Sequence, residues 1–210
     1  MDRLFSICER HKVLIISDEI HQDLITGSTP FTSALTVASG AYADNIIAMS
    51  SLSKSFNMAS LHHAEVIIPN EKLRGQYNAY KTHVYHADSD VIAETAITVA
   101  YTHPEAEAWL TDVLAVIREN YEYLCRELCA ALPQIRISPI DGTYLAWIDF
   151  GAYVKAEDMH DLFENKCRIA PSFGEWFGGK NYTTFVRLNL ATSLENIRTA
   201  THNIIKYVLP

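Results

Sequence analysis

Three short apolar runs in the first third of the chain predict buried β-strands. They are VLIIS at 13–17, NIIAM at 45–49 and EVIIP at 65–69. Each run is continuous, rich in β-branched residues and bounded by polar residues, which is typical of strands that are buried on both faces. Because polar or helical segments separate the runs, we expect a mostly parallel α/β sheet covered by helices.

The pattern becomes helical after the third run. Between 104 and 132 the apolar residues recur every three or four positions. Pro104 suits the first turn of a helix, Glu105 complements the helix dipole there, and Pro133 ends the pattern. We therefore predict a long amphipathic helix over 104–132, well above the usual length, that connects two lobes.

A second group of strands and helices follows this long helix. The segments IRISPI at 135–140, TYLAWIDF at 143–150 and TTFVRLNLA at 183–191 are interpreted as strands of a small sheet. Helices are expected over 155–167 and 193–208, with Ser193 as the N-cap of the latter. The predicted organisation is thus an incomplete α/β sheet domain over 1–103, the helix over 104–132, and an α+β domain over 133–210.

Composition narrows the classes of protein that remain. Hydrophobic residues make up 49% of the 210 residues and charged residues 20%, which indicates a packed globular core. The net charge of -8 argues against a nucleic-acid-binding surface. No apolar run approaches the ~20 residues of a membrane span, and the N-terminus lacks the apolar core of a signal peptide. The four cysteines form no C-x-x-C pair, so we expect reduced thiols in a cytoplasmic protein.

Two side chains at the ends of predicted strands are candidates for chemistry. Asp18 follows the first apolar run, and Lys54 lies in SLSKSF at 51–56, after the second. In parallel α/β sheets ligands gather at the carboxyl ends of strands, and neighbouring parallel strands would bring both residues to one edge. Considered singly, an aspartate there is more often a turn former and a loop lysine is usually solvated. Their joint placement favours a functional interpretation.

The residues around these two positions resemble a known family. SDEIHQDL at 17–24 and SLSKSFNMASLH at 51–62 are together similar to the pyridoxal-phosphate (PLP) enzymes of fold type I. The similarity is greatest to the MalY/PatB-like branch of class I/II aminotransferases, which includes cystathionine β-lyases and cysteine desulfhydrases. GTYLAWIDF at 142–150 and FVRLNLAT at 185–192 agree in the same order. The resemblance implies the C-terminal part of the PLP-binding large domain over 1–103, followed by the small C-terminal domain.

The resemblance also implies roles for individual residues. Lys54 would bind the cofactor aldehyde covalently and then remove the α-proton of the substrate. Asp18 would pair with the pyridine nitrogen and keep it protonated. His21 stands where typical aminotransferases have a tyrosine near the 3′-oxygen of the cofactor, and it favours the carbon–sulfur lyase branch. Arg187 would bind the α-carboxylate of the substrate, for which its planar fork is suited.

Three further residues are assigned to the phosphate of the cofactor by the same resemblance. Ser51 and Ser53 offer small hydroxyl donors, and His62 stands where many aminotransferases have an arginine. No metal site is expected, because the histidines at 62, 63, 83 and 86 show no helical H-x-x-x-H pair with an acidic partner.

The implied activity is cleavage of the Cβ–S bond of cystathionine, cysteine or a similar sulfur amino acid. An aminotransferase is the alternative, because both reactions start with loss of the α-proton, and a non-catalytic fragment or partner-binding module is another. The resemblance covers only the C-terminal portion of the family, so we expect a fragment, a truncated reading frame or one piece of a split protein. Such a chain alone would bind cofactor poorly, while the full-length protein would be a homodimer with a small-molecule substrate.

Overall fold

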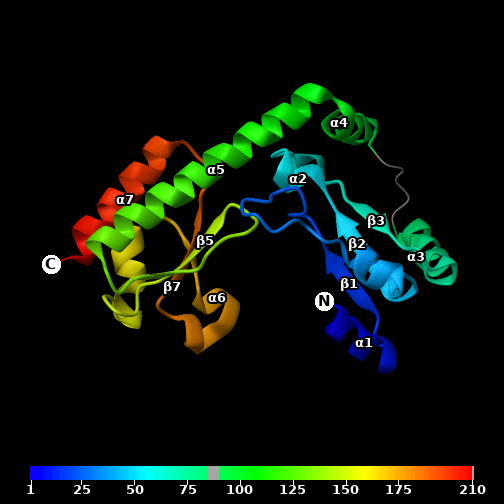
Figure 1. The fold of residues 1–210 in the computed structure, drawn as a ribbon, viewed down its shortest axis with the longest axis horizontal. Coiled ribbons are helices and arrows are strands. Elements are labelled where there is room, and N and C mark those ends of the chain that lie inside the picture. Colours follow the sequence, from blue (N-terminus) through cyan, green and yellow to red (C-terminus); the bar gives the residue numbers. More distant parts are fainter. Residues whose placement is uncertain (85–89, 210) are drawn as a thin grey trace. The chain divides into compact units, whose positions relative to one another are not determined.

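The computed structural model describes residues 1–84 and 90–209, which form two compact units. The first unit comprises residues 1–25 and 29–110, and the second comprises residues 26–28 and 111–210 (Figure 1). No helix within the described residues is long and apolar enough to cross a membrane.

A three-stranded sheet organises the first unit, in the order β1 (Ile15–Asp18), β2 (Ile46–Ser50), β3 (Glu65–Ile67). β1 and β2 are parallel, with Asp18 opposite Met49. β3 pairs antiparallel to β2, which corrects the expectation of a mostly parallel sheet. The physical reason is that the segment after β2 stays at the carboxyl edge of that strand, so β3 starts where β2 ended and returns beside it.

The strands of the first sheet are less buried than their apolar runs predict. Along β1 intermediate and exposed residues alternate, and Ile16 is 63% exposed. In β3, Ile67 is 49% exposed. β1 and β3 are the two edges of this sheet, and within the described residues their outer sides have no neighbouring strand. The prediction that these strands are buried on both faces is therefore wrong for this chain.

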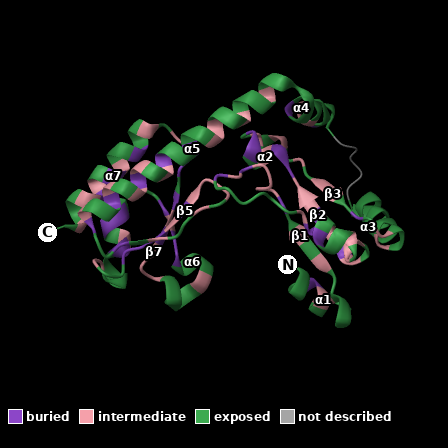
Figure 2. Ribbon diagram, viewed as in Figure 1, coloured by how far each residue is buried: buried purple, intermediate pink, exposed green. Residues whose placement is uncertain are grey.

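Helices surround the sheet of the first unit without burying much of their own surface. They are α1 (Asp2–Arg10), η1 (Ala34–Gly40), η2 (Ala43–Asn45), α2 (Leu52–Ser55), η3 (Ala59–Leu61), α3 (Glu71–Val84) and α4 (Val91–Thr102). A core forms where Phe5 packs with Val37 and Ile46. α3 has no buried residue and is drawn almost wholly as exposed (Figure 2).

The long helix predicted at 104–132 is present as α5 (Pro104–Ala131). Its first turns pack Ala106 and Leu110 against Leu52 and Phe56 of the first unit. The boundary between the two compact units falls inside α5, after Leu110.

The second unit has an antiparallel sheet in the order β4 (Arg136–Ile137), β5 (Leu145–Asp149), β7 (Phe185–Asn189), β6 (Ser172–Phe173). The predicted C-terminal helix is α7 (Leu194–Val208), and Ser193 caps it by accepting a hydrogen bond from Asn196 N. The segment 155–167 forms η4 (Ala156–Asp158) and the π-helical η5 (Asp161–Lys166) instead of an α-helix. Two short turns, α6 (Glu175–Gly178) and η6 (Gly179–Tyr182), precede β7.

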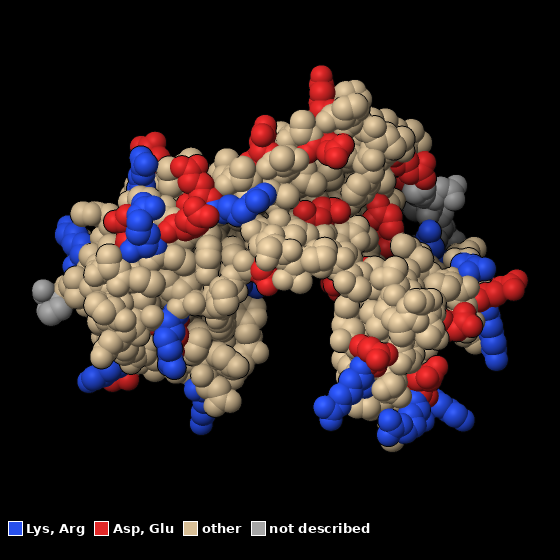
Figure 3. Space-filling model, in the orientation of Figure 1, with Lys and Arg blue, Asp and Glu red and all other residues tan. Residues whose placement is uncertain are grey.

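The core of the second unit lies between its sheet and the helices α5 and α7. It is a single cluster that includes Ile148, Phe150, Phe163 and Val186, each 0% exposed. Its residues alternate along β5 and β7 with partly exposed ones, as expected for a sheet covered on one face. In Figure 3 several acidic side chains lie along α5, whereas Asp149 on β5 is 2% exposed.

Candidate functional site

The first candidate residue, Asp18, lies at the carboxyl end of β1 and is exposed. Its Oδ1 accepts a hydrogen bond from Ile20 N at 3.2 Å, which starts a turn. The same turn contains His21, which is half-buried, and its main chain is closed by a hydrogen bond from Leu24 N to His21 O. Asp18 and His21 therefore lie on one short turn after the strand.

Lys54 lies on α2, the one-turn helix that follows β2. Ser51 is the N-cap of this helix and is 4% exposed, while Lys54 itself is exposed. The Ser51 hydroxyl accepts from Ser53 N at 3.1 Å and donates to His63 O at 2.7 Å. It also lies 2.5 Å from the Ser53 hydroxyl. The structure thus brings Ser51, Ser53 and Lys54 together, with the lysine turned to solvent.

The pairing of β1 with β2 determines how these two groups of residues relate. Because the strands are parallel and neighbouring, the turn after Asp18 and the helix that carries Lys54 leave the sheet at the same edge. This is the arrangement that the sequence pattern predicts for the aspartate and the lysine. The roles of the predicted site residues in binding a ligand stay predictions.

His62 lies directly after η3, in the left-handed region with φ of 48°. It is exposed, and the neighbouring Asn57 also has a positive φ, of 54°. Asparagine and histidine are among the non-glycine residues that most often adopt a left-handed backbone, so the residue types at 57 and 62 suit these two φ values.

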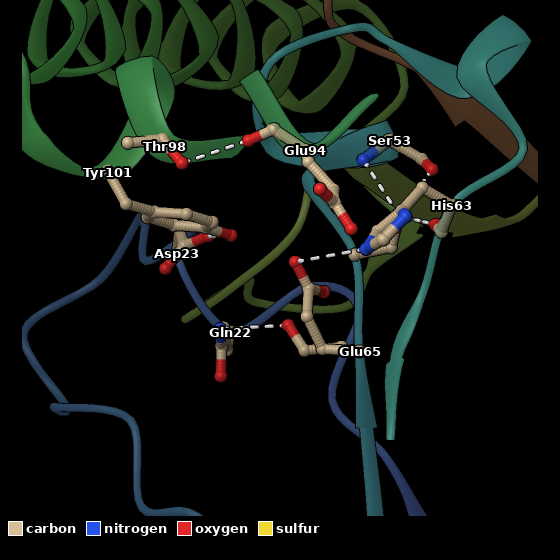
Figure 4. Close-up of polar contacts among 10 residues, drawn as sticks. Gln22, Asp23, Ser53, His63, Glu65, Glu94, Thr98 and Tyr101 are labelled. Atoms are coloured by element: carbon tan, nitrogen blue, oxygen red, sulfur yellow. Dashed lines mark hydrogen bonds and ion pairs between the residues drawn. The ribbon is translucent and has the colours of Figure 1, made fainter. Parts of the chain in front are cut away.

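A group of polar residues at the same edge was not singled out from the sequence (Figure 4). Asp23 Oδ2 accepts hydrogen bonds from Ser55 Oγ at 2.8 Å and from Tyr101 Oη at 3.1 Å. Gln22 Nε2 donates to Ser50 Oγ at 2.9 Å. These contacts connect the turn after β1 to the end of β2, to α2 and to α4. On α2 the contact is made by Ser55, the residue that follows Lys54.

Tyr101 remains protonated across the physiological range and so keeps donating to Asp23. Burial of the phenol, and then the nearby negative charge of Asp23, raise the pKa of Tyr101 to about 12. Nothing in the sequence around Tyr101 indicated this contact, because α4 carries only a weakly amphipathic apolar pattern. Asp23 does lie in the SDEIHQDL block, which was the one available signal.

His63 and Glu65 form a second polar pair, with His63 Nε2 lying 3.9 Å from Glu65 Oε1. Glu65 is opposite Ser50 in the ladder between β2 and β3. A pocket of about 370 Å³ opens beside this pair, and Glu65, Gln22 and Tyr101 are among the residues that line it. None of the predicted cofactor residues lines this pocket, although Gln22, Ser50 and Tyr101 of the polar group at the same edge do.

Arg187 belongs to the second unit, on β7 opposite Trp147. Its Nη2 donates to Ser172 Oγ at 3.3 Å, and its guanidinium carbon lies 4.5 Å from the ring centroid of Phe177. Its role toward the same ligand as Lys54 stays a prediction. Elsewhere, the described residues include no cluster of three or more histidine, cysteine or acidic side chains suited to a metal, and His86 lies outside them.

Comparison with known proteins agrees with these features. Residues 1–204 match the family described as aminotransferase class I and II. The chain is 35% identical to protein MalY of Escherichia coli over 197 residues, 90% of this chain and 47% of that protein. It is 30% identical to cystathionine beta-lyase PatB of Bacillus subtilis over 202 residues, 93% of this chain and 50% of that protein. The chain thus spans about half the length of these relatives.

A solved structure supports the fold. The PLP-bound C-S lyase from Staphylococcus hominis, complexed with L-cycloserine, superposes with a TM-score of 0.86 and 30% identity, covering 98% of this chain and 49% of that one. The α/β architecture expected from the sequence, a part of the PLP-transferase fold, is therefore confirmed.

Proposed function

The chain belongs to the aminotransferase class I and II family. On that premise we propose that it forms part of a PLP-dependent carbon–sulfur β-lyase that acts on sulfur amino acids. The observation that carries the proposal is the parallel pairing of β1 and β2, because it places the segments that contain Asp18 and Lys54 at the same edge of the sheet. The lyase reaction is favoured over transamination by the similarity to PatB, a protein named as a cystathionine beta-lyase.

The chemistry of the donor set fits pyridoxal 5′-phosphate. Lys54 supplies an exposed primary amine for the aldehyde, and Asp18 supplies an exposed carboxylate for the pyridine nitrogen. His21 would face the 3′-oxygen, while Ser51, Ser53 and His62 would contribute to the phosphate. When bound, the cofactor supplies an electron-withdrawing ring that stabilises negative charge at the substrate α-carbon.

The remaining steps fall to side chains of this chain. Arg187 would bind the α-carboxylate through paired N–H donors and so orient the α-proton. The Lys54 amine, once free, would accept that proton on Nζ, which requires its neutral form. Asp18 would keep its negative charge throughout and so hold the ring nitrogen protonated. With the charge held at the α-carbon, a thiolate leaves from Cβ, and hydrolysis of the remaining fragment gives pyruvate and ammonia.

The cofactor part of the proposal is tested by absorbance. The purified chain, and a longer polypeptide that contains it, are mixed with pyridoxal 5′-phosphate and the visible band of the lysine-bound cofactor is recorded. We expect a band that disappears in Lys54→Ala and persists in Lys72→Ala, which removes an exposed lysine from α3 of the same unit. If no polypeptide containing the chain gives the band, a non-catalytic module is the better interpretation.

The reaction is tested by supplying L-cystathionine to the cofactor-loaded protein and measuring thiol, pyruvate and keto-acid products. Release of thiol and pyruvate in equal amounts is the expected result. Amino-group transfer to a keto acid without thiol release would instead identify an aminotransferase.

The proposal also covers the oligomeric state of the protein and its location in the cell. A homodimer in the cytoplasm, with a small-molecule amino acid as substrate, is what the family resemblance implies. Sedimentation of the cofactor-loaded protein should give twice the mass of one chain, and cell fractionation should recover it with the cytosol.

A further inference from the structure

The guanidinium of Arg187 is covered by an aromatic ring. Its central carbon lies 4.5 Å from the ring centroid of Phe177, within the range of a cation–π contact. Phe177 belongs to the short helix α6 and is 54% exposed. A phenylalanine with about half of its surface exposed to solvent therefore lies against the arginine.

The ring of Phe177 is held in place from the sheet. Trp147 lies opposite Arg187 in the β5–β7 ladder and contacts Phe177 edge-to-face, with centroids 5.8 Å apart and planes at 79°. Trp147 in turn stacks on Phe185 at 5.3 Å. Phe177 thus belongs to an aromatic group that includes Trp147 on β5 and Phe185 on β7, the strand that carries Arg187.

Under this ring the arginine keeps an unused donor. Its Nε is shielded from water, and among the described residues nothing accepts a hydrogen bond from it. Within the same residues no carboxylate forms an ion pair with Arg187, whose Nη2 donates a hydrogen bond to Ser172 Oγ at 3.3 Å. A carboxylate stabilises a cation more strongly when the cation is shielded from water and incompletely hydrogen-bonded than when the cation is fully hydrated.

We propose that Phe177 is a positioning residue that fixes the plane of the Arg187 guanidinium and keeps water from it, so that Arg187 binds a monocarboxylate. The inference rests on the proposed function, in which Arg187 holds the α-carboxylate of the amino-acid substrate. Phe177 acts through Arg187 and has no part in the chemical steps. The ligand class is a small monocarboxylate that binds the Arg187 guanidinium beside the Phe177 ring.

The test uses the ¹⁵N-labelled full chain without cofactor. The Nε–Hε signal of Arg187, assigned by its loss in Arg187→Lys, reports exchange with water and side-chain mobility. Sodium acetate is then titrated against sodium chloride at equal ionic strength. In Phe177→Leu we expect faster exchange, greater mobility and acetate binding about threefold to tenfold weaker, in line with the strength of a cation–π contact. Phe177→Tyr, which keeps the ring face, should restore all three.

The matched control is Trp176→Leu. Trp176 is the neighbouring aromatic residue on α6, is 62% exposed, and contacts Phe173. This variant should leave the Arg187 signal and the acetate affinity unchanged. The proposal is overturned if Phe177→Leu behaves as the wild type, or if Trp176→Leu causes the same loss.

The outcomes separate this inference from the proposed function. If acetate shifts the Arg187 signal in the wild type and binds Phe177→Leu with the same affinity, the role of Phe177 is refuted while the assignment of Arg187 stands. If acetate does not shift the Arg187 signal in the wild type, the assignment of Arg187 and the role of Phe177 both fail. The assignment of Lys54 and Asp18 is unaffected in each case, because the measurement uses no cofactor.

Discussion

Ser51 donates a hydrogen bond to the backbone carbonyl of His63 at 2.7 Å, and the same hydroxyl caps the helix that carries Lys54. One side chain therefore both starts α2 and anchors it to the segment that leads into β3. The helix of the proposed cofactor lysine and the segment before β3 are thus linked through one side chain.

Replacing Ser51 by alanine should destabilise the first unit and weaken cofactor binding together. Loss of the cap and of the donor to His63 O is expected to cost about 1–3 kcal/mol of unfolding free energy. Denaturant titration measures the stability, and the visible cofactor band measures the binding. Ser193→Ala is the matched control, because it removes the N-cap of α7 in the second unit. An equal loss of cofactor binding in Ser193→Ala would contradict this prediction.

The contact between Tyr101 and Asp23 predicts a stability loss at high pH. The pKa of Tyr101 is raised to about 12 in the folded chain, from an ordinary value near ~10 in the unfolded one. The contribution of Tyr101 to stability is therefore fully present below about pH 10 and is lost as the pH rises toward about 12.

The variant Asp23→Asn checks the cause of this shift. It removes the negative charge while burial of the phenol remains, so the pKa of Tyr101 should fall but stay above its ordinary value. Titration of ¹³C-labelled tyrosine ring signals measures it. A pKa of Tyr101 that does not change in Asp23→Asn would exclude Asp23 as a cause.

The cysteines should differ in reactivity according to burial. Burial raises the pKa of Cys167 to about 11 and also raises the pKa of Cys125, so both have little thiolate at neutral pH. Cys129 is exposed. With iodoacetamide at pH 8, mass spectrometry should find Cys129 modified first and Cys167 modified only after denaturant is added. Early modification of Cys167 in the native chain would show that its surroundings open readily.

Asn120 should be among the residues of the second unit most sensitive to substitution. It is 0% exposed, and its Nδ2 donates to Leu190 O at 2.9 Å and to Thr192 O at 2.8 Å, just after the strand that carries Arg187. Asn120→Ala leaves both carbonyls without this donor and should cost about 2–4 kcal/mol of unfolding free energy. Asn165→Ala, at an exposed position of the same unit, should cost less than about 0.5 kcal/mol. Similar costs for the two variants would argue against this role of Asn120.

The elements that the sequence predicted well are those encoded by local signals. α5 and α7 follow from periodic apolar residues and from caps, so their bounds agree with the expected 104–132 and 193–208 within a few residues. The segment 155–167 has similar periodicity, yet forms 3-10 and π-helical turns. The direction of β3 was missed because the apolar run at 65–69 is the same for a parallel and an antiparallel strand, so no local pattern reports it.

The residues of the candidate site were likewise predicted only where the signal is local in the sequence. Asp18 was found because it directly follows an apolar run, and Lys54 because it lies a few residues after another, which are features of a short stretch of sequence. The contact between Asp23 and Tyr101 joins residues 78 positions apart, and Phe177 meets Arg187 only after the chain has turned through η6. Such pairs become visible only when the fold brings their elements together.

The alignment of Ile15–Asp18 on Ile46–Met49 has a consequence for how this chain tolerates length changes. Side chains alternate between faces along a strand, so a slip of one residue would point the Asp18 carboxylate to the opposite side. An insertion of one residue within either strand should therefore abolish cofactor binding even if the chain still folds. The same insertion in the loop between the strands should be tolerated.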